Sequence, residues 1–236
     1  MDRNKKYFLA FLNGNPEKNV LFEPFISKGL TEALIWRRGE HVWDTPDEYI
    51  STLVSCTERT RSDMFFLDPA DFSQDIRASL TEALGRYRAS GQAVGAGIIC
   101  RTEEDVETFS GLADCICAYN GVRSEKVPCI MMDGTPEDAL AGGYSGFFAA
   151  KDARGLLRKF GGRIRILGGL GVDFIVGSNP VSIYDAVDEI CADHPGIWAC
   201  GSGGMVPDAN YLEFISLLGA FGRMRKKEIS ASSISK

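Results

Sequence analysis

Short apolar runs rich in strand-forming residues alternate along the chain with longer amphipathic or charged stretches. The eight runs are Val20–Phe25, Met64–Leu67, Ala93–Cys100, Asp114–Tyr119, Val127–Met132, Gly146–Ala150, Arg163–Leu167 and Gly196–Cys200. Continuous apolar runs of this length are typical of parallel strands that are buried on both faces. The pattern therefore predicts that each run is a buried β-strand.

The stretches between the runs carry the start signals of helices. Thr45 is a candidate N-cap, followed by Pro46 in the first turn and by acidic residues at the positive end of the helix dipole. Thr135 and Asn179 precede prolines in the same way. Helix signals are found in seven segments, which are 45–54, 72–90, 102–105, 135–138, 152–160, 180–190 and 210–221. We therefore expect a helix between most consecutive strands.

Strands that alternate with helices predict a parallel sheet with helical crossovers. Eight such units close into a barrel more readily than they form an open sheet, so we expect a (β/α)8 TIM barrel close to minimal length. The alternative is an open, doubly wound sheet, which usually has a glycine-rich turn after its first strand. Pro24 to Ser27 form no such turn. We expect one domain over residues 1–227 and a polar, disordered tail over 228–236.

The composition indicates the class of protein and the compartment in which it is expected. The 236 residues are 44% apolar and 25% charged, which is ordinary for a globular protein. A net charge of −6 without a basic patch argues against a nucleic-acid partner. Seven cysteines without a CxxC pair indicate reduced thiols, and hence a cytoplasmic protein. No apolar run reaches the ~18 residues of a membrane span, and the apolar stretch near the start is too short for a signal peptide.

In a barrel of this kind the active site lies at the carboxyl ends of the strands. Asp68, Asp133 and Lys151 are the candidate catalytic residues there. The carboxylates Asp68, Asp133 and Glu23 could share a metal or a proton, because like charges held close together raise one pKa, which suits acid–base work. A helix cap or a salt bridge is the competing interpretation, above all for Asp133, which closely precedes Pro136. The candidates for substrate binding at the strand ends are Glu23, Arg101, Asn120, Gly168, Gly169, Gly203 and Gly204.

The glycine pairs after the last two runs suggest a phosphate site. Backbone N–H groups in such loops can face an anion, and barrels often bind phosphate after their last two strands. Tight turns are the alternative reason for glycine at these positions.

A metal site is a further hypothesis. Asp68, Cys100 and Cys200 are candidate zinc ligands because of their expected strand-end positions, and Glu23 and Asp133 could join them. A cysteine on an apolar strand is more often part of the core. His41 and His194 are not expected to be ligands, because one lies in a polar connection and the other precedes the last strand.

Motifs near both ends of the chain form a combination that is more specific than each motif alone. One stretch contains Gly168-Gly169-Leu170 and continues through Gly177-Ser178 to Gly201-Ser202-Gly203-Gly204. Near the start, Tyr7–Glu23 and Asp63–Asp68 complete the pattern. Together they resemble the uroporphyrinogen decarboxylase superfamily, which also includes zinc-dependent methyltransferases that act with corrinoid proteins. The resemblance covers about half of the chain and implies a (β/α)8 barrel with an aspartate at the end of its second strand.

The chain differs from that superfamily where its chemistry is defined. The decarboxylases carry an Arg-Gln-Ala-Gly-Arg segment after the first strand and a histidine in the last loop, where this chain has Ile26–Leu30 and Gly203. The methyltransferases hold zinc with a His-x-Cys pair on a middle strand and a cysteine in the last loop. Here that middle strand reads Ile130–Asp133, so neither residue set is complete.

Three functions are compatible with the resemblance and with the family residues that this chain lacks. The leading one is methyl transfer between a small-molecule substrate and a separate corrinoid protein, with any zinc acting as a Lewis acid and Asp68 as ligand or proton acceptor. The second is decarboxylation of a smaller acid, with Arg101 or Lys151 holding its carboxylate. The third is a barrel without catalysis that binds a ligand or partner, as the missing histidine and zinc ligands suggest. Barrels of this superfamily often pair, so a homodimer is compatible with each.

Overall fold

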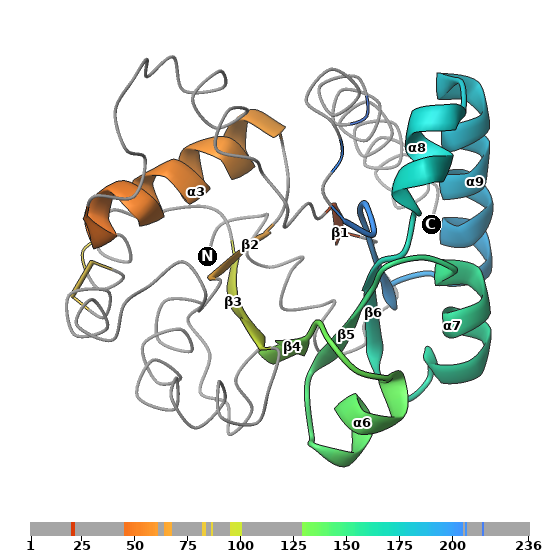
Figure 1. The fold of residues 1–236 in the computed structure, drawn as a ribbon, viewed down its shortest axis with the longest axis horizontal. Coiled ribbons are helices and arrows are strands. Elements are labelled where there is room, and N and C mark those ends of the chain that lie inside the picture. Colours follow the sequence, from red (N-terminus) through yellow and green to blue (C-terminus); the bar gives the residue numbers. More distant parts are fainter. Residues whose placement is uncertain are drawn as a thin grey trace, which may run out of the picture.

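Parallel strand pairing organises the fold, which combines one sheet with helices (Figure 1). The computed structural model describes residues 20–21, 45–60, 64–67, 82–83, 86, 95–100, 129–204, 206 and 214. Its strands are β1 (Val20–Leu21), β2 (Met64–Leu67), β3 (Gly95–Cys100), β4 (Cys129–Met131), β5 (Gly146–Ala149), β6 (Arg165–Gly168) and β7 (Trp198–Cys200). Its helices are α3 (Pro46–Thr60), α6 (Pro136–Ala141), α7 (Ala153–Phe160), α8 (Val172–Gly177) and α9 (Pro180–Asp193). The expected α/β class with a parallel sheet is confirmed.

The strand order places the first strand next to the last. The sheet reads β1-β7-β6-β5-β4-β3-β2, and every pair in it is parallel. Apart from β1, each strand therefore lies beside its neighbours in the chain. A doubly wound sheet instead reverses direction at a switch point in its middle. The strands from β2 to β7 therefore follow their order in the chain, and β1 lies at the β7 end of the sheet.

One predicted strand does not take its expected place. The run Asp114–Tyr119 was expected to lie between the strands that follow and precede it, but β3 pairs directly with β4 through Cys100 and Met131. The interpretation of that run as the fourth strand of the sheet is therefore wrong. The run itself lies outside the described residues.

Local chemistry sets the helix starts. The Thr135 side chain accepts a hydrogen bond from the backbone of Asp138, whose carboxylate accepts one from the Thr135 backbone, so a capping box opens α6. Asn179 caps α9 through the amide of Ser182. α8 was not predicted, and it begins without a side-chain cap. Of the predicted segments 72–90 and 210–221, only Glu82, Ala83, Arg86 and Phe214 are described, each in a helical position.

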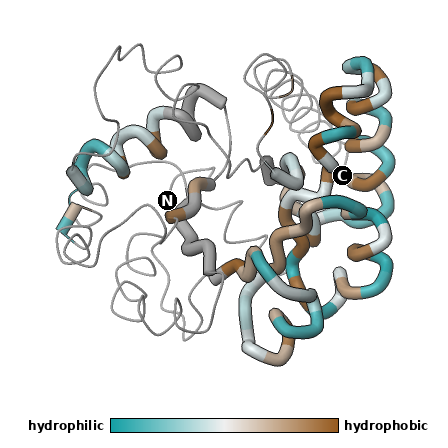
Figure 2. The backbone as a smooth tube through the Cα atoms, viewed as in Figure 1, coloured by the Kyte–Doolittle hydropathy of each residue, from teal (hydrophilic) through white to brown (hydrophobic). Residues whose placement is uncertain are grey.

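Strands β5 and β6 are buried on both faces. One face packs beneath the helices, in a core that includes Phe147, Ile166 and Trp198. The intervening residues Phe148 and Leu167 are at most 3% exposed although they are not part of that core. Helices α7 to α9 cover the first face beside β5 to β7, with their apolar sides turned inward (Figures 1 and 2). Burial on both faces explains why these strands read as continuous apolar runs.

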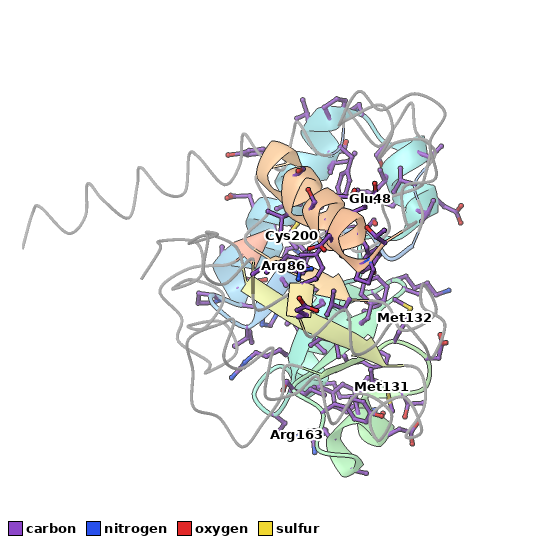
Figure 3. All side chains as sticks on the ribbon, turned by 90° about the vertical axis from the view of Figure 1, so that its left-hand side faces the viewer. Glu48, Arg86, Met131, Met132, Arg163 and Cys200 are labelled. Atoms are coloured by element: carbon purple, nitrogen blue, oxygen red, sulfur yellow. The ribbon has the colours of Figure 1, made fainter. Side chains whose placement is uncertain are left out.

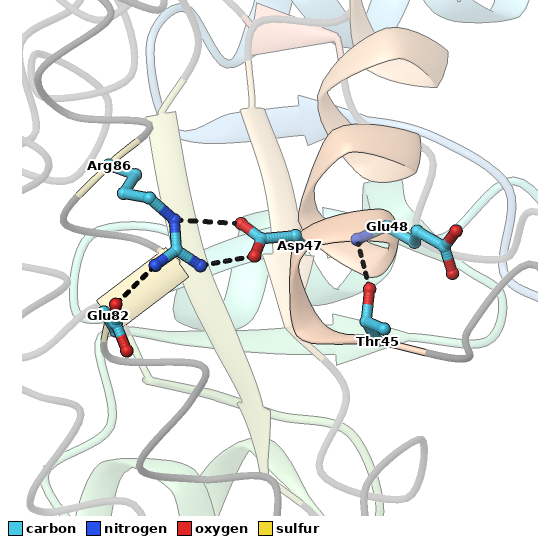
Figure 4. Close-up of polar contacts among 5 residues, drawn as sticks. All are labelled: Thr45, Asp47, Glu48, Glu82 and Arg86. Carbon is cyan, nitrogen blue, oxygen red and sulfur yellow. Dashed lines mark hydrogen bonds and ion pairs between the residues drawn. The ribbon is translucent and has the colours of Figure 1, made fainter.

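An ion-pair network holds α3 to a neighbouring helical position (Figure 4). The guanidinium of Arg86 donates through two nitrogens to the Asp47 carboxylate and through a third to Glu82, at 2.7 Å. The hydrogen bonds that Arg86 donates to the Asp47 carboxylate raise the pKa of Arg86. All three groups are solvent-exposed, so the network fixes orientation more than it adds stability. No helix among the described residues is long and apolar enough to cross a membrane.

Candidate active site

The carboxyl ends of the parallel strands lie at one edge of the sheet, and four of them deliver predicted site residues there. Asp133 follows β4, Lys151 follows β5, Gly168 and Gly169 end β6, and Gly203-Gly204 follow β7. β4, β5, β6 and β7 are consecutive neighbours in the sheet. The sequence therefore placed these residues on the same edge correctly, and parallel pairing is the reason that they gather there.

Asp133 is exposed and does not cap the helix that follows it. Thr135 is the N-cap of α6, and the carboxylate that completes the capping box belongs to Asp138. The capping interpretation of Asp133 is therefore wrong, whereas the predicted start of this helix at Thr135 is confirmed. Asp133 thus lies at the carboxyl edge, and the N-cap of α6 is Thr135.

Lys151 lies in a tightly bent connection between β5 and α7. The next residue, Asp152, has a left-handed backbone with φ 60°, and its carboxylate caps α7 by accepting from the Gly155 amide at 3.1 Å. The Ala153 amide donates to the Gly169 carbonyl at 3.2 Å. Lys151 itself is exposed. The ends of β5 and β6 are thus tied together immediately beside the lysine.

The glycines of the carboxyl edge make close backbone contacts. A Cβ at Gly168 would lie 2.7 Å from the Ser202 carbonyl oxygen, and one at Gly203 would overlap the Ala150 carbonyl. The Gly203 amide donates to the Leu170 carbonyl at 2.7 Å. Packing therefore requires small residues here, and the amide of Gly203 is already used within the loops. This arrangement supports the interpretation of these glycines as tight turns.

Cys200 fits a core cysteine. It is 1% exposed and lies with Trp198 in the core beneath the helices. Figure 3 shows that Cys200 lies apart from Met131 of β4. Among the described residues no three His, Cys, Asp or Glu side chains form a group that could hold a metal ion.

The remaining predicted site residues cannot be placed relative to this edge. Glu23, Asp68, Arg101 and Asn120 lie outside the described residues, and so does the expected tail over 228–236. Cys100 ends β3, with its backbone paired to Met131, and its side chain also lies outside the described part.

Two buried groups in the neighbourhood were not anticipated. The indole N–H of Trp198 donates to the carbonyl of Gly168 at 2.8 Å, and the fully buried Ser202 hydroxyl donates to the Gly204 carbonyl at the same distance. At the opposite, amino end of β6, burial lowers the pKa of Arg165, whose Nε has no hydrogen-bond partner among the described residues. A tryptophan in an apolar run gives no signal of its partner, so the sequence could not indicate the first contact.

The comparisons with known proteins add no relative. No protein-family model matches the chain, and no curated protein matches it significantly. The assignment of function therefore rests on the residues at the carboxyl edge and on the sequence resemblance.

Proposed function

We propose that the protein is an enzyme of the uroporphyrinogen decarboxylase type that moves a methyl group between a small substrate and a corrinoid protein. The observation that carries this proposal is the convergence of Asp133, Lys151 and the glycine-rich turns on neighbouring strand ends. An exposed acid and an exposed ammonium at a common edge are suited to proton transfer with a bound molecule. The active site of a barrel enzyme lies at this edge.

The proposed scaffold is a closed barrel of the (β/α)8 type. The position of β1 beside β7 supports closure, since only the gap between β1 and β2 separates the observed order from a complete circle. The burial of both faces of β5 and β6 supports it as well. A crystal structure would test the proposal: pairing that leaves β1 and β2 at open edges would contradict it.

Zinc at the carboxyl edge is not favoured by the described residues. Cys200 packs beneath the helices. Gly203 stands where the methyltransferases carry a cysteine ligand, and a side chain there would overlap the Ala150 carbonyl. We therefore assign no step to a metal. Asp68 and Cys100 stay predicted ligands, and metal analysis of protein purified without chelator tests them, since a zinc site requires close to one zinc per chain.

The proposed chemistry uses the two described polar groups. When bound, the corrinoid of the partner supplies the cobalt centre that accepts or donates the methyl group. Lys151 donates a proton to the heteroatom that loses the methyl, and Asp133 orients the substrate or returns the proton. Both side chains are exposed at the edge, where a substrate can reach them.

Three large apolar side chains are exposed on the two helices that follow β6. α8 directly follows the carboxyl end of β6, and its Phe174 and Val176 are 37% and 44% exposed. Val181 at the start of α9 is 68% exposed. Large apolar side chains gathered on a surface often mark a protein interface. A corrinoid protein that delivers its cofactor to this edge would cover them.

Decarboxylation of a small acid is the second candidate, because Lys151 can hold a carboxylate. The two reactions are separated by incubating the protein with methylcobalamin and a thiol, and in parallel with a panel of small carboxylic acids. Loss of the methylcobalamin absorption supports methyl transfer, and released CO2 supports decarboxylation. Lys151→Gln and Asp133→Asn should abolish the activity that is found, whereas Glu137→Gln, a change on exposed α6, should not. The absence of both activities would support a protein that binds a ligand or partner without catalysis.

A further inference from the structure

The second half of the chain separates its charges by sign. No acidic residue lies between Asp152 and Asp173, and five basic residues lie in this segment. No lysine or arginine lies between Arg165 and Arg223. α7 is therefore a basic helix, whereas α8 and α9 carry only acidic charges. Helices on the same side of the molecule thus differ in the sign of their charge (Figure 1).

α7 and α9 meet at one ion pair. Asp185, Glu189 and Asp193 follow each other at intervals of four residues, so their side chains lie on one side of α9. Arg154 of α7 pairs with the middle residue of this stripe, Glu189, at 2.5 Å. The hydrogen bond to Glu189 raises the pKa of Arg154, and the charge of Asp193 adds to this effect. The acidic stripe of α9 therefore lies beside the basic helix.

Exposed charges of opposite sign lie on either side of this ion pair. The acidic part of the surface consists of Asp185 and Asp193, which flank the ion pair on α9. The basic part consists of Arg158, one turn beyond the ion pair on α7, and Arg163, which follows that helix. All four side chains are exposed, and none forms a salt bridge within the described part of the chain. The surface is therefore acidic at one end and basic at the other.

We propose that a second copy of this chain docks on this surface, with the basic part of each copy against the acidic part of the other. A surface with adjacent parts of opposite charge is complementary to itself when a two-fold axis exchanges the two parts. Every contact in such a dimer forms twice. The inference rests on the charges of α7 and α9 alone and does not depend on the proposed function.

Other partners fit only one part of the surface. A nucleic acid or an anionic membrane would be attracted by Arg158 and Arg163 but repelled by the acidic stripe of α9. A uniformly basic protein would be repelled in turn by the end of α7. A partner has to be bipolar in the same way to satisfy both parts, and the chain itself meets this requirement.

Salt should weaken the dimer, because its contacts are made by exposed side chains. Raising NaCl from about 0.1 M to about 1 M shortens the Debye length from ~10 Å to ~3 Å. The contributions of single exposed ion pairs are small, so we expect the dissociation constant of the dimer to rise about tenfold in total. Sedimentation velocity of the full chain over a range of concentrations measures it. A monomer at both salt concentrations, or a dimer that salt does not weaken, would contradict the proposal.

Charge reversal tests the surface itself. One variant combines Arg158→Glu with Arg163→Glu, and a second combines Asp185→Lys with Asp193→Lys. Each variant alone should be monomeric at low salt, because like charges then face each other in both contacts. An equal mixture of the two should form a dimer with one copy of each, since both contacts again join opposite charges. A chain with all four substitutions keeps the native net charge and should also dimerise.

Three outcomes of this experiment overturn the proposal. Dimers that persist in either variant alone would place the contact elsewhere on the molecule. A mixture that stays monomeric would show that the two parts do not meet each other. Assemblies that grow beyond two copies would replace the two-fold arrangement with a head-to-tail one.

Cross-linking of the native chain keeps the test valid should a variant fail to fold. A carbodiimide condenses a lysine amine with a carboxylate in contact with it, and the reagent takes up the water that is lost. Mixed unlabelled and 15N-labelled chains distinguish links between copies from links within one copy. We expect a link between copies from Lys159, which adjoins Arg158, to Asp185 or Asp193. The link within one copy from Lys159 to Glu137, which are 3.0 Å apart, is the positive control. That link without any between copies would contradict the proposal.

Discussion

The indole N–H of Trp198 on β7 donates a hydrogen bond of 2.8 Å to the carbonyl of Gly168 at the end of β6. Trp198 is fully buried, and Gly168 has a left-handed backbone with φ 67°. The bond therefore links one strand to the turn at the carboxyl end of its neighbour. It stabilises the turn from beneath, on the face that packs against the helices.

Removing this donor should destabilise the protein. A benzothienyl analogue of tryptophan at position 198 keeps the ring shape and leaves the buried Gly168 carbonyl without its partner, which costs about 1–3 kcal/mol of unfolding free energy. Trp198→Phe should cost more, because the smaller ring also leaves a cavity. Urea unfolding measures both. An analogue as stable as the native protein would show that the hydrogen bond contributes nothing.

The start of α6 offers a test of which residue caps it. Thr135→Ala removes the side chain that accepts from the Asp138 amide and should lower the unfolding free energy by ~1 kcal/mol. Asp133→Asn should cost less than Thr135→Ala, because Thr135 and Asp138 form the capping box. Thermal or urea unfolding compares the two variants. A larger loss in Asp133→Asn would restore the capping interpretation of that residue.

Two glycines should respond in opposite ways to alanine. At Gly168 the φ of 67° strains any side chain, and a Cβ would lie 2.7 Å from both Phe148 and the Ser202 carbonyl. Gly168→Ala should therefore cost at least the ~1–2 kcal/mol of a left-handed residue. At Gly177, which ends α8, no atom lies within 4 Å of an added Cβ. Gly177→Ala should gain about 0.4–1 kcal/mol by restricting the unfolded chain. Losses of equal size in the two variants would contradict this account.

The sequence predicted the elements whose signals are local. The apolar run Met64–Leu67 coincides with β2, and the cap residues Thr135 and Asn179 stand at the starts of α6 and α9. Side-chain caps and apolar runs act within a few residues, so they can be seen without the fold. α8 was missed because its six residues start at Gly171 without any capping side chain. The run Asp114–Tyr119 was misassigned because its order in the sheet depends on pairing between distant segments.

The candidate site was predictable only in outline. Parallel topology alone brings Asp133 and Lys151 to one edge, so their positions after strands sufficed. The close contact between Gly203 and Ala150 joins residues far apart in the sequence, and no local pattern records it. Cys200 shows the opposite case: a strand-end position suggested a metal ligand, whereas the alternation of faces along β7 places it with Trp198 beneath the helices.

The ion pair between Lys159 and Glu137 should appear in the titration of that carboxylate. The hydrogen bond from Lys159, at 3.0 Å, lowers the pKa of Glu137 below its usual value. Because the folded pKa is depressed, the pair stabilises the protein above the pKa of the unfolded chain. That contribution is lost as the pH falls through the folded pKa. Both side chains are more than half exposed, at 68% and 55%, so the gain is small and is screened by salt. In a carboxyl NMR titration, Lys159→Ala should raise the pKa of Glu137 toward its usual value. Arg158→Ala changes an exposed residue on the same helix as Lys159 and should leave the pKa of Glu137 below its usual value. A pKa for Glu137 that is the same in Lys159→Ala and in the native protein would show that the pair does not persist in solution.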